Sequence, residues 1–146
     1  MKDNENKIIV KIICGIIVVG MIAGNFYLTF QSPKQTTALS ESVRLWLSTH
    51  GWEMTPKQIR SNAHIPVFFL LGMAFFIFGR AMQWKWFVSF ILASFLALLD
   101  EGIKMILPTR EFDFVDLSKD FVGIGVAFFI ALTICSSRII CKKSNK

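Results

Sequence analysis

The chain has 146 residues, of which 53% are hydrophobic and 14% aromatic, and its formal net charge is +6. This apolar content is too high for an ordinary soluble domain of that length, and the length suits one unit, residues 1–146, better than two domains. Its basic residues are dispersed between hydrophobic runs with no recognisable nucleic-acid-binding fold, so membrane topology explains the positive charge better than a nucleic-acid partner does.

The first of four long hydrophobic runs covers residues 8–30. At about 1.5 Å per residue, it is long enough for a helix to cross a hydrocarbon core of ~30 Å. A signal peptide is the alternative, because lysines precede the run. The run is longer than a usual signal core and ends without a convincing small-x-small cleavage site. We therefore expect a retained membrane-spanning helix.

A polar connection, residues 31–62, follows the first span. Residues 40–47 could form a short amphipathic helix with Ser40 as its N-cap. Trp46 and Trp52 would suit a membrane interface. A plain surface loop with interfacial aromatic residues fits this segment equally well, so both alternatives stay open.

Three more spans are expected at residues 64–82, 86–107 and 121–140. With four spans, nine of the sixteen basic residues fall on one side of the membrane: Lys2, Lys7, Lys11, Arg80, Lys85, Arg138, Lys142, Lys143 and Lys146. The positive-inside rule then predicts cytoplasmic termini. The expected fold is all-α: a polytopic, antiparallel four-helix bundle that spans a membrane.

Six of the ten acidic residues lie between positions 98 and 125, at the predicted outer side. Asp100, Glu101 and Lys104 are inside the third span, where an ionisable group costs ~2.5–3.5 kcal/mol on insertion scales. Asp100 and Lys104 share one helical face, because they are four residues apart. Such charges either pair to fix the register of the bundle or form a functional site.

A second acidic series leads into the fourth span. Asp113, Asp116, Asp120 and Gly123 are separated by 3, 4 and 3 residues, the spacing of one helical face. A helix N-terminus favours acidic groups electrostatically, which offers a purely structural explanation. His64 begins the second span at the same outer side, so its imidazole could face these carboxylates.

The sequence holds no metal-ligand spacing and no nucleophile motif, and its three cysteines show neither a zinc pattern nor a disulfide framework. A carboxylate-rich site with one histidine could bind a divalent cation through oxygen ligands, but Lys104 and Arg110 argue against an all-metal site, so we expect no metal and no cofactor. Lys104 and Arg110 suit an anionic phosphate or carboxylate headgroup. The candidate acid/base (catalytic) residues are Glu101, Asp100, His64, Asp116 and Asp120.

The spacing of these residues resembles the VanZ-like family of small bacterial membrane proteins. The matching positions are His64, Asp100-Glu101, Pro108-Thr109-Arg110, Asp116, Asp120 and Gly123. One position departs, because Lys104 stands where the family usually has Gln. The resemblance implies a bacterial inner-membrane location and an association with resistance to the lipoglycopeptide teicoplanin.

Two functions remain open. The first is a site at the outer leaflet that binds or modifies a lipid-linked envelope precursor or another anionic headgroup, or meets the glycopeptide itself. The second is a non-catalytic, modulatory membrane protein whose buried charges serve folding and topology. A transporter is less favoured, because four spans are few and no internal repeat is present. The bilayer is the expected partner under either function, and a homo-oligomer is left open.

Overall fold

The computed structural model describes residues 2–108 and 110–144. This part of the chain forms five helices and no strand, which confirms the expected all-α class. The helices are α1 (Lys2–Phe30), α2 (Pro33–Ser48), α3 (Pro56–Ala81), α4 (Trp86–Lys104) and α5 (Phe114–Ser144).

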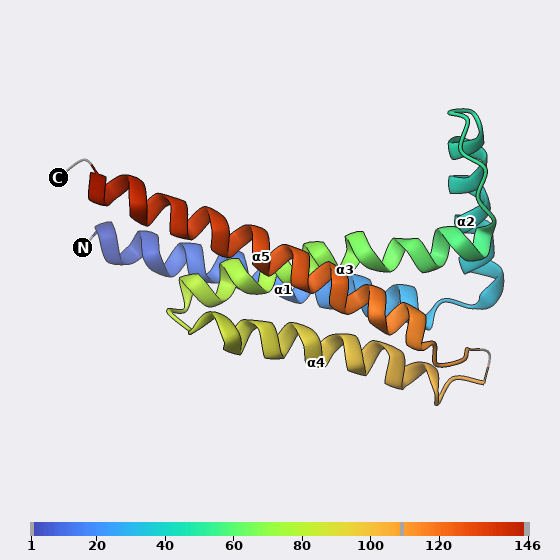
Figure 1. Ribbon diagram of the computed structural model, residues 1–146. Helices are drawn as coiled ribbons and strands as arrows, with labels where there is room; N and C mark the ends of the chain where they lie inside the picture. Colours follow the sequence, from blue (N-terminus) through green and yellow to red (C-terminus); the bar gives the residue numbers. More distant parts are fainter. Residues whose placement is uncertain (1, 109, 145–146) are drawn as a thin grey trace.

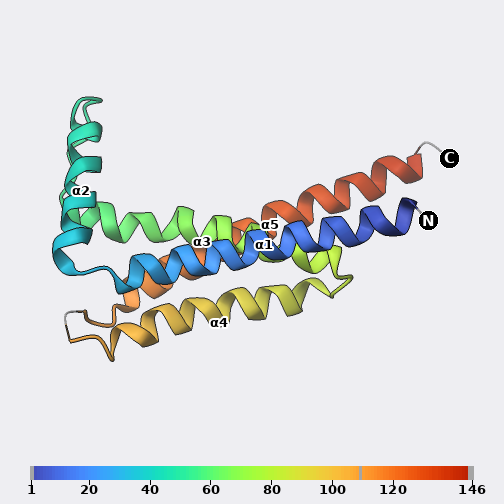
Figure 2. The same cartoon turned by 180° about the vertical axis from the view of Figure 1, so that it is seen from behind.

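Four of the helices, α1, α3, α4 and α5, are long and apolar enough to cross a membrane. They lie alongside one another, with the start of α1 and the end of α5 at the same end of the bundle (Figures 1 and 2). Their outer faces carry large exposed apolar side chains, such as Ile16, Leu70, Ile91 and Phe129. Lipid tails would cover these side chains, as expected for a multi-pass membrane protein.

The most extensive packing in the bundle is between α3 and α5, and Gly123 lies within it. A Cβ atom at this position would lie 2.5 Å from the carbonyl oxygen of Ile65 and 2.9 Å from the backbone nitrogen of Phe69. Only glycine lets the two backbones approach this closely. Gly123 is one turn beyond Asp120, so the same approach brings that carboxylate against α3.

The polar connection, residues 31–62, is mostly helical, so of the two alternatives the helix is present around residues 40–47 and the plain loop is not. It contains all of α2 and the start of α3. Ser32, rather than Ser40, is the N-cap of α2: its hydroxyl accepts a hydrogen bond from the Gln35 backbone N–H at 3.4 Å, with Pro33 at the first helical position. Ser40 lies inside the helix and donates to the carbonyl of Thr36 at 2.8 Å. A capping box with proline next to it thus starts the helix earlier than expected.

The spanning helices also differ from the predicted bounds. An equivalent capping box, Thr55 with Gln58, starts α3 at Pro56 rather than at 64, so His64 lies inside the helix instead of at its entrance. α5 likewise begins at Phe114 rather than at 121, whereas α4 ends at Lys104, before 107. Hydrophobicity locates the membrane core, but caps decide where a helix begins.

α2 is at the end of the bundle opposite the termini, where it stands at a steep angle to the long helices and projects to one side of them (Figures 1 and 2). The link between α4 and α5 is at this same end. Several apolar side chains of α2 are exposed, among them Leu45 and Trp46. A helix in this orientation with exposed apolar residues is suited to the plane of a membrane interface. Residues of α2, among them Thr36 and Leu39, line a cavity together with His64 and Asp100.

Candidate functional site

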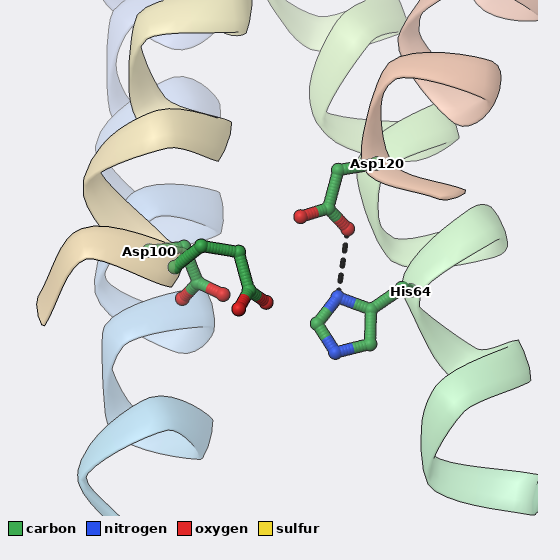
Figure 3. A group of neighbouring side chains, drawn as sticks. His64, Asp100 and Asp120 are labelled. Atoms are coloured by element: carbon green, nitrogen blue, oxygen red, sulfur yellow. Dashed lines mark hydrogen bonds and ion pairs between the residues drawn. The ribbon is translucent and has the colours of Figure 1, made fainter. Parts of the chain in front are cut away.

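The first contact of the site joins α3 to α5. His64 Nδ1 lies 2.7 Å from Asp120 Oδ1, and Asp120 is completely buried (Figure 3). The other ring nitrogen of His64, Nε2, is 3.6 Å from a carboxylate oxygen of Asp116. Asp116 in turn accepts a hydrogen bond of 2.5 Å from the Ser61 hydroxyl. His64 therefore lies between two carboxylates of α5.

A second contact joins α4 to α1. Asp100 Oδ1 accepts hydrogen bonds from the side-chain amide of Asn25, at 2.9 Å, and from the hydroxyl of Thr29. Asp100 is 2% exposed and Thr29 is 4% exposed, so this pairing is made away from solvent. Buried carboxylates need such donors, because an unsatisfied charge in a low-dielectric interior is costly. Asn25 and Thr29 thus fix α1 against the polar face of α4.

Glu101 and Lys104 form a third, internal pair on α4. The Lys104 ammonium donates to Glu101 Oε1 and lies 3.7 Å from Asp100 Oδ2. Glu101 Oε2 accepts from the backbone N–H of Asp113 at 3.2 Å, which draws the link between α4 and α5 over the site. Both paired side chains are buried. The predicted facing of Asp100 and Lys104 is therefore present, but Glu101 is the closer partner.

Four of these side chains converge. His64, Asp100, Glu101 and Asp120 each place one nitrogen or oxygen within 4.8 Å of the others. We call this group the carboxylate–histidine cluster. Figure 3 shows Asp100 facing His64 and Asp120 across the space between the helices. Asp120 Oδ2 is buried and has no hydrogen-bond partner among the described residues.

A cavity of about 180 Å³ opens beside the cluster. We call it the basic cleft, because Arg60, Lys104 and Arg110 line it together with His64 and Asp100. Its apolar lining comes from α1, α2 and α3: Leu28, Leu39, Val43, Ile59, Ala63 and Val67. A polar floor with apolar walls is the general form of a binding site for an amphiphilic molecule.

Arg110 lies at the edge of the basic cleft, where it connects the α4–α5 link to the start of α2. Its Nη2 donates to the carbonyl of Gln31 at 3.0 Å and to the hydroxyl of Thr36 at 2.7 Å. Partial burial and the neighbouring positive charge of Arg60 lower the pKa of Arg110. An anionic ligand would raise the pKa of Arg110 again, because its negative charge would compensate for the lost hydration and for the repulsion between Arg60 and Arg110.

The structure thus brings together most of the predicted site residues: His64, Asp100, Glu101, Lys104 and Asp120, with Asp116 beside His64 and Arg110 at the cleft rim. Asp113 differs, because its carboxylate accepts from the backbone N–H of Val115 at 2.7 Å, at the start of α5, instead of facing the cluster. Asn25, Thr29 and Arg60 were not predicted. Asn25 and Thr29 could have been recognised in the sequence, because they are polar residues one helical turn apart in an otherwise apolar span.

In comparisons with known proteins, no family model, curated protein or solved structure matches this chain. The resemblance to the VanZ-like family consequently remains a prediction based on the motif residues. The catalytic and binding roles of the site residues also remain predictions, although their positions are now known. Function must therefore be inferred from the chemistry of the cluster and the cleft.

Proposed function

We propose that this chain is a multi-pass protein of a bacterial cytoplasmic membrane that binds the anionic headgroup of a lipid-linked envelope molecule. The observation that carries the proposal is the basic cleft: three cationic side chains, Arg60, Lys104 and Arg110, share a cavity with apolar walls beside a buried acid/base cluster. Phosphate groups pair well with guanidinium donors, and apolar walls suit an attached hydrocarbon chain.

The proposed orientation places the cleft at the outer leaflet. Most of the basic residues near span ends are on the side of the termini, and the positive-inside rule assigns that side to the cytoplasm. The cleft lies at the opposite end of the bundle, where α2 supplies part of its lining. An amphiphile could then enter sideways, with its headgroup at the level of Arg110 and its chain along α2 and α3.

The same site offers proton transfer beside a bound headgroup. His64 lines the cleft and is hydrogen-bonded to Asp120, so the imidazole is held in one orientation by a buried carboxylate. Pairs of this kind act as general acids or bases in many enzymes. Glu101, in contrast, is held by Lys104 and by the backbone of Asp113. We therefore assign any proton transfer to His64 and the positioning of Lys104 to Glu101.

The resemblance adds a physiological theme, protection against teicoplanin-type glycopeptides. The test is a susceptibility assay in a sensitive Gram-positive host that expresses the wild type or Glu101→Gln at matched membrane levels. Glu101→Gln keeps the side-chain shape and removes the charge that holds Lys104. The matched control is Glu111→Gln, which removes one charge from an exposed residue of the same link.

Protection by the wild type and the control, but not by Glu101→Gln, is the expected result. Equal protection by all three proteins would contradict a role for the cluster. No protection by the wild type would contradict a role in glycopeptide resistance. Headgroup binding would then be tested directly with lipids.

A second candidate function is non-catalytic, with the buried charges serving only to assemble the bundle. One observation favours it: Asp100 is bound by α1 through Asn25 and Thr29, and Lys104 pairs with it along α4. These contacts connect helices without any ligand. If this function is correct, the double change Glu101→Gln with Lys104→Gln, which removes both paired charges and can keep an amide hydrogen bond, retains function, whereas Glu101→Gln alone lowers the yield of folded protein.

A further inference from the structure

The carboxylate–histidine cluster has the dimensions of a cation site. Its four ligand atoms all lie within 4.8 Å of one another. Ligands on opposite sides of a divalent cation lie about twice the bond length apart, roughly 4.0–4.8 Å for bonds of roughly 2.0–2.4 Å. One ion could therefore contact all four groups after small side-chain adjustments. The ligands come from three helices, so no ligand-spacing motif could reveal the site in the sequence.

The charges within the cluster are unbalanced. Asp100, Glu101 and Asp120 are three buried carboxyl groups, and Lys104 is the one buried ammonium beside them. When ionised, these four buried groups carry a net charge of −2, and a protonated His64 would reduce it to −1; the neighbouring cations Arg60 and Arg110 line the cleft, where Gln31 and Thr36 bind Arg110. Buried charges in a low-dielectric environment have to be paired or neutralised. A single divalent cation supplies the two missing positive charges.

An unsatisfied atom points to the same location. Asp120 is 0% exposed, and its Oδ2 has no hydrogen-bond partner in the described part of the chain, although Oδ1 is bound to His64. In Figure 3 this free oxygen is directed toward the side of the cluster that holds Asp100. A buried carboxylate oxygen without a donor is energetically costly, and a metal ion is one partner that satisfies it.

We propose that His64, Asp100, Glu101 and Asp120 bind one divalent transition-metal ion of the Mn²⁺ and Zn²⁺ class. One imidazole with three carboxylates favours such an ion over Ca²⁺, which takes oxygen ligands. Lys104 limits the affinity, because its ammonium contacts Glu101 and lies 3.7 Å from Asp100. Metal binding requires no headgroup in the cleft and can be measured without lipid, but the two proposals share His64, Asp100 and Lys104, and a metal-bound His64 would not act as the acid/base group.

The experiment is a Mn²⁺ titration of the full-length protein, purified in detergent and stripped with EDTA, in which electron paramagnetic resonance measures the free ion. Wild type is expected to bind one Mn²⁺ per chain, with competition by Zn²⁺. Asp120→Asn should weaken binding by at least about 10–100-fold, because losing even a group that only orients a ligand costs that much and Asp120 is proposed to bind the ion directly. Glu111→Gln should bind like the wild type, because it removes an equal charge from an exposed position.

Lys104→Gln should change the affinity for Mn²⁺ in the opposite direction. It removes the competing positive charge and keeps a hydrogen-bond donor for Glu101, so Mn²⁺ should bind about tenfold more tightly. If Asp120→Asn does not give a monodisperse protein, the Mn²⁺ affinity of Lys104→Gln relative to that of the wild type tests the proposal by itself. The proposal is overturned if wild type shows no saturable binding, if Asp120→Asn binds like Glu111→Gln, or if Lys104→Gln binds no more tightly than wild type.

Discussion

His64 on α3 and Asp120 on α5 are 56 residues apart in the sequence, yet they are joined by a hydrogen bond of 2.7 Å inside the bundle. Two features make this contact possible. The capping box at Thr55 extends α3 past His64, and Gly123 lets α5 pack directly on the α3 backbone. The site therefore depends on helix packing as much as on its own polar residues.

Substitution of Gly123 should separate α3 from α5. In Gly123→Val, the Cβ atom would lie 2.5 Å from the carbonyl oxygen of Ile65, so the helices must move apart. We expect a loss of stability of about 1–3 kcal/mol, the usual cost of overpacking. Thermal unfolding in detergent measures the effect. Gly125→Val is the matched control, because a Cβ atom there meets no atom within 4 Å; equal losses for both variants would contradict the packing argument.

The pairing of His64 with Asp120 should appear as an energetic coupling. A double-mutant cycle of His64→Gln and Asp120→Asn is expected to yield an interaction energy of about 0.5–3 kcal/mol, because the two residues are in direct contact. Denaturant unfolding of the four proteins in the same detergent provides the data. The cycle formed by Asp120→Asn and Thr133→Val, whose hydroxyl donates only to the Phe129 carbonyl, should show additive effects. Additivity in both cycles would mean that the His64 contact contributes nothing.

The sequence predicts the four spans well, since each depends only on local hydrophobicity. It also predicts that Lys104 faces Asp100, because positions four apart meet on any helix. The contacts of Asp100 with Asn25 and Thr29 depend on how α1 is rotated about its axis. This rotation cannot be predicted from the spacing of residues in the sequence. α2 is an intermediate case. The Ser32-Pro33 start with Gln35 is a capping box that can be recognised in the sequence, but the steep angle of α2 to the long helices is a tertiary property.

Thr29 should anchor α1 to the site. Thr29→Val keeps the shape of the side chain but removes the hydroxyl that donates to Asp100, leaving a buried carboxylate oxygen with one donor fewer. The expected loss of stability is about 1–3 kcal/mol, the cost of an unsatisfied buried polar group. Thermal unfolding of Thr133→Val serves as the comparison, since it makes the same chemical change at an exposed position. A Thr29→Val protein as stable as this control would show that the Asn25 amide alone suffices for Asp100.

Arg110 should determine the affinity of the basic cleft for anionic headgroups. Its guanidinium holds the α1–α2 link through Gln31 and Thr36 and lines the cleft beside Arg60. Arg110→Gln can still donate one hydrogen bond to that link but lacks the charge. Retention of phosphatidylglycerol by protein in mixed lipid nanodiscs, measured by native mass spectrometry, should fall about tenfold, consistent with loss of a charge-assisted hydrogen bond.

Lys119→Gln is the matched control for this lipid measurement. Lys119 is a basic residue at the same end of the bundle, but its ammonium donates to Ser61 and Asn62 outside the cleft lining. General attraction of anionic lipids to this end would decrease equally in both variants, because each loses one positive charge. A selective decrease in Arg110→Gln locates the headgroup in the cleft. Equal retention by wild type and both variants would exclude the cleft as a site for anionic phospholipid.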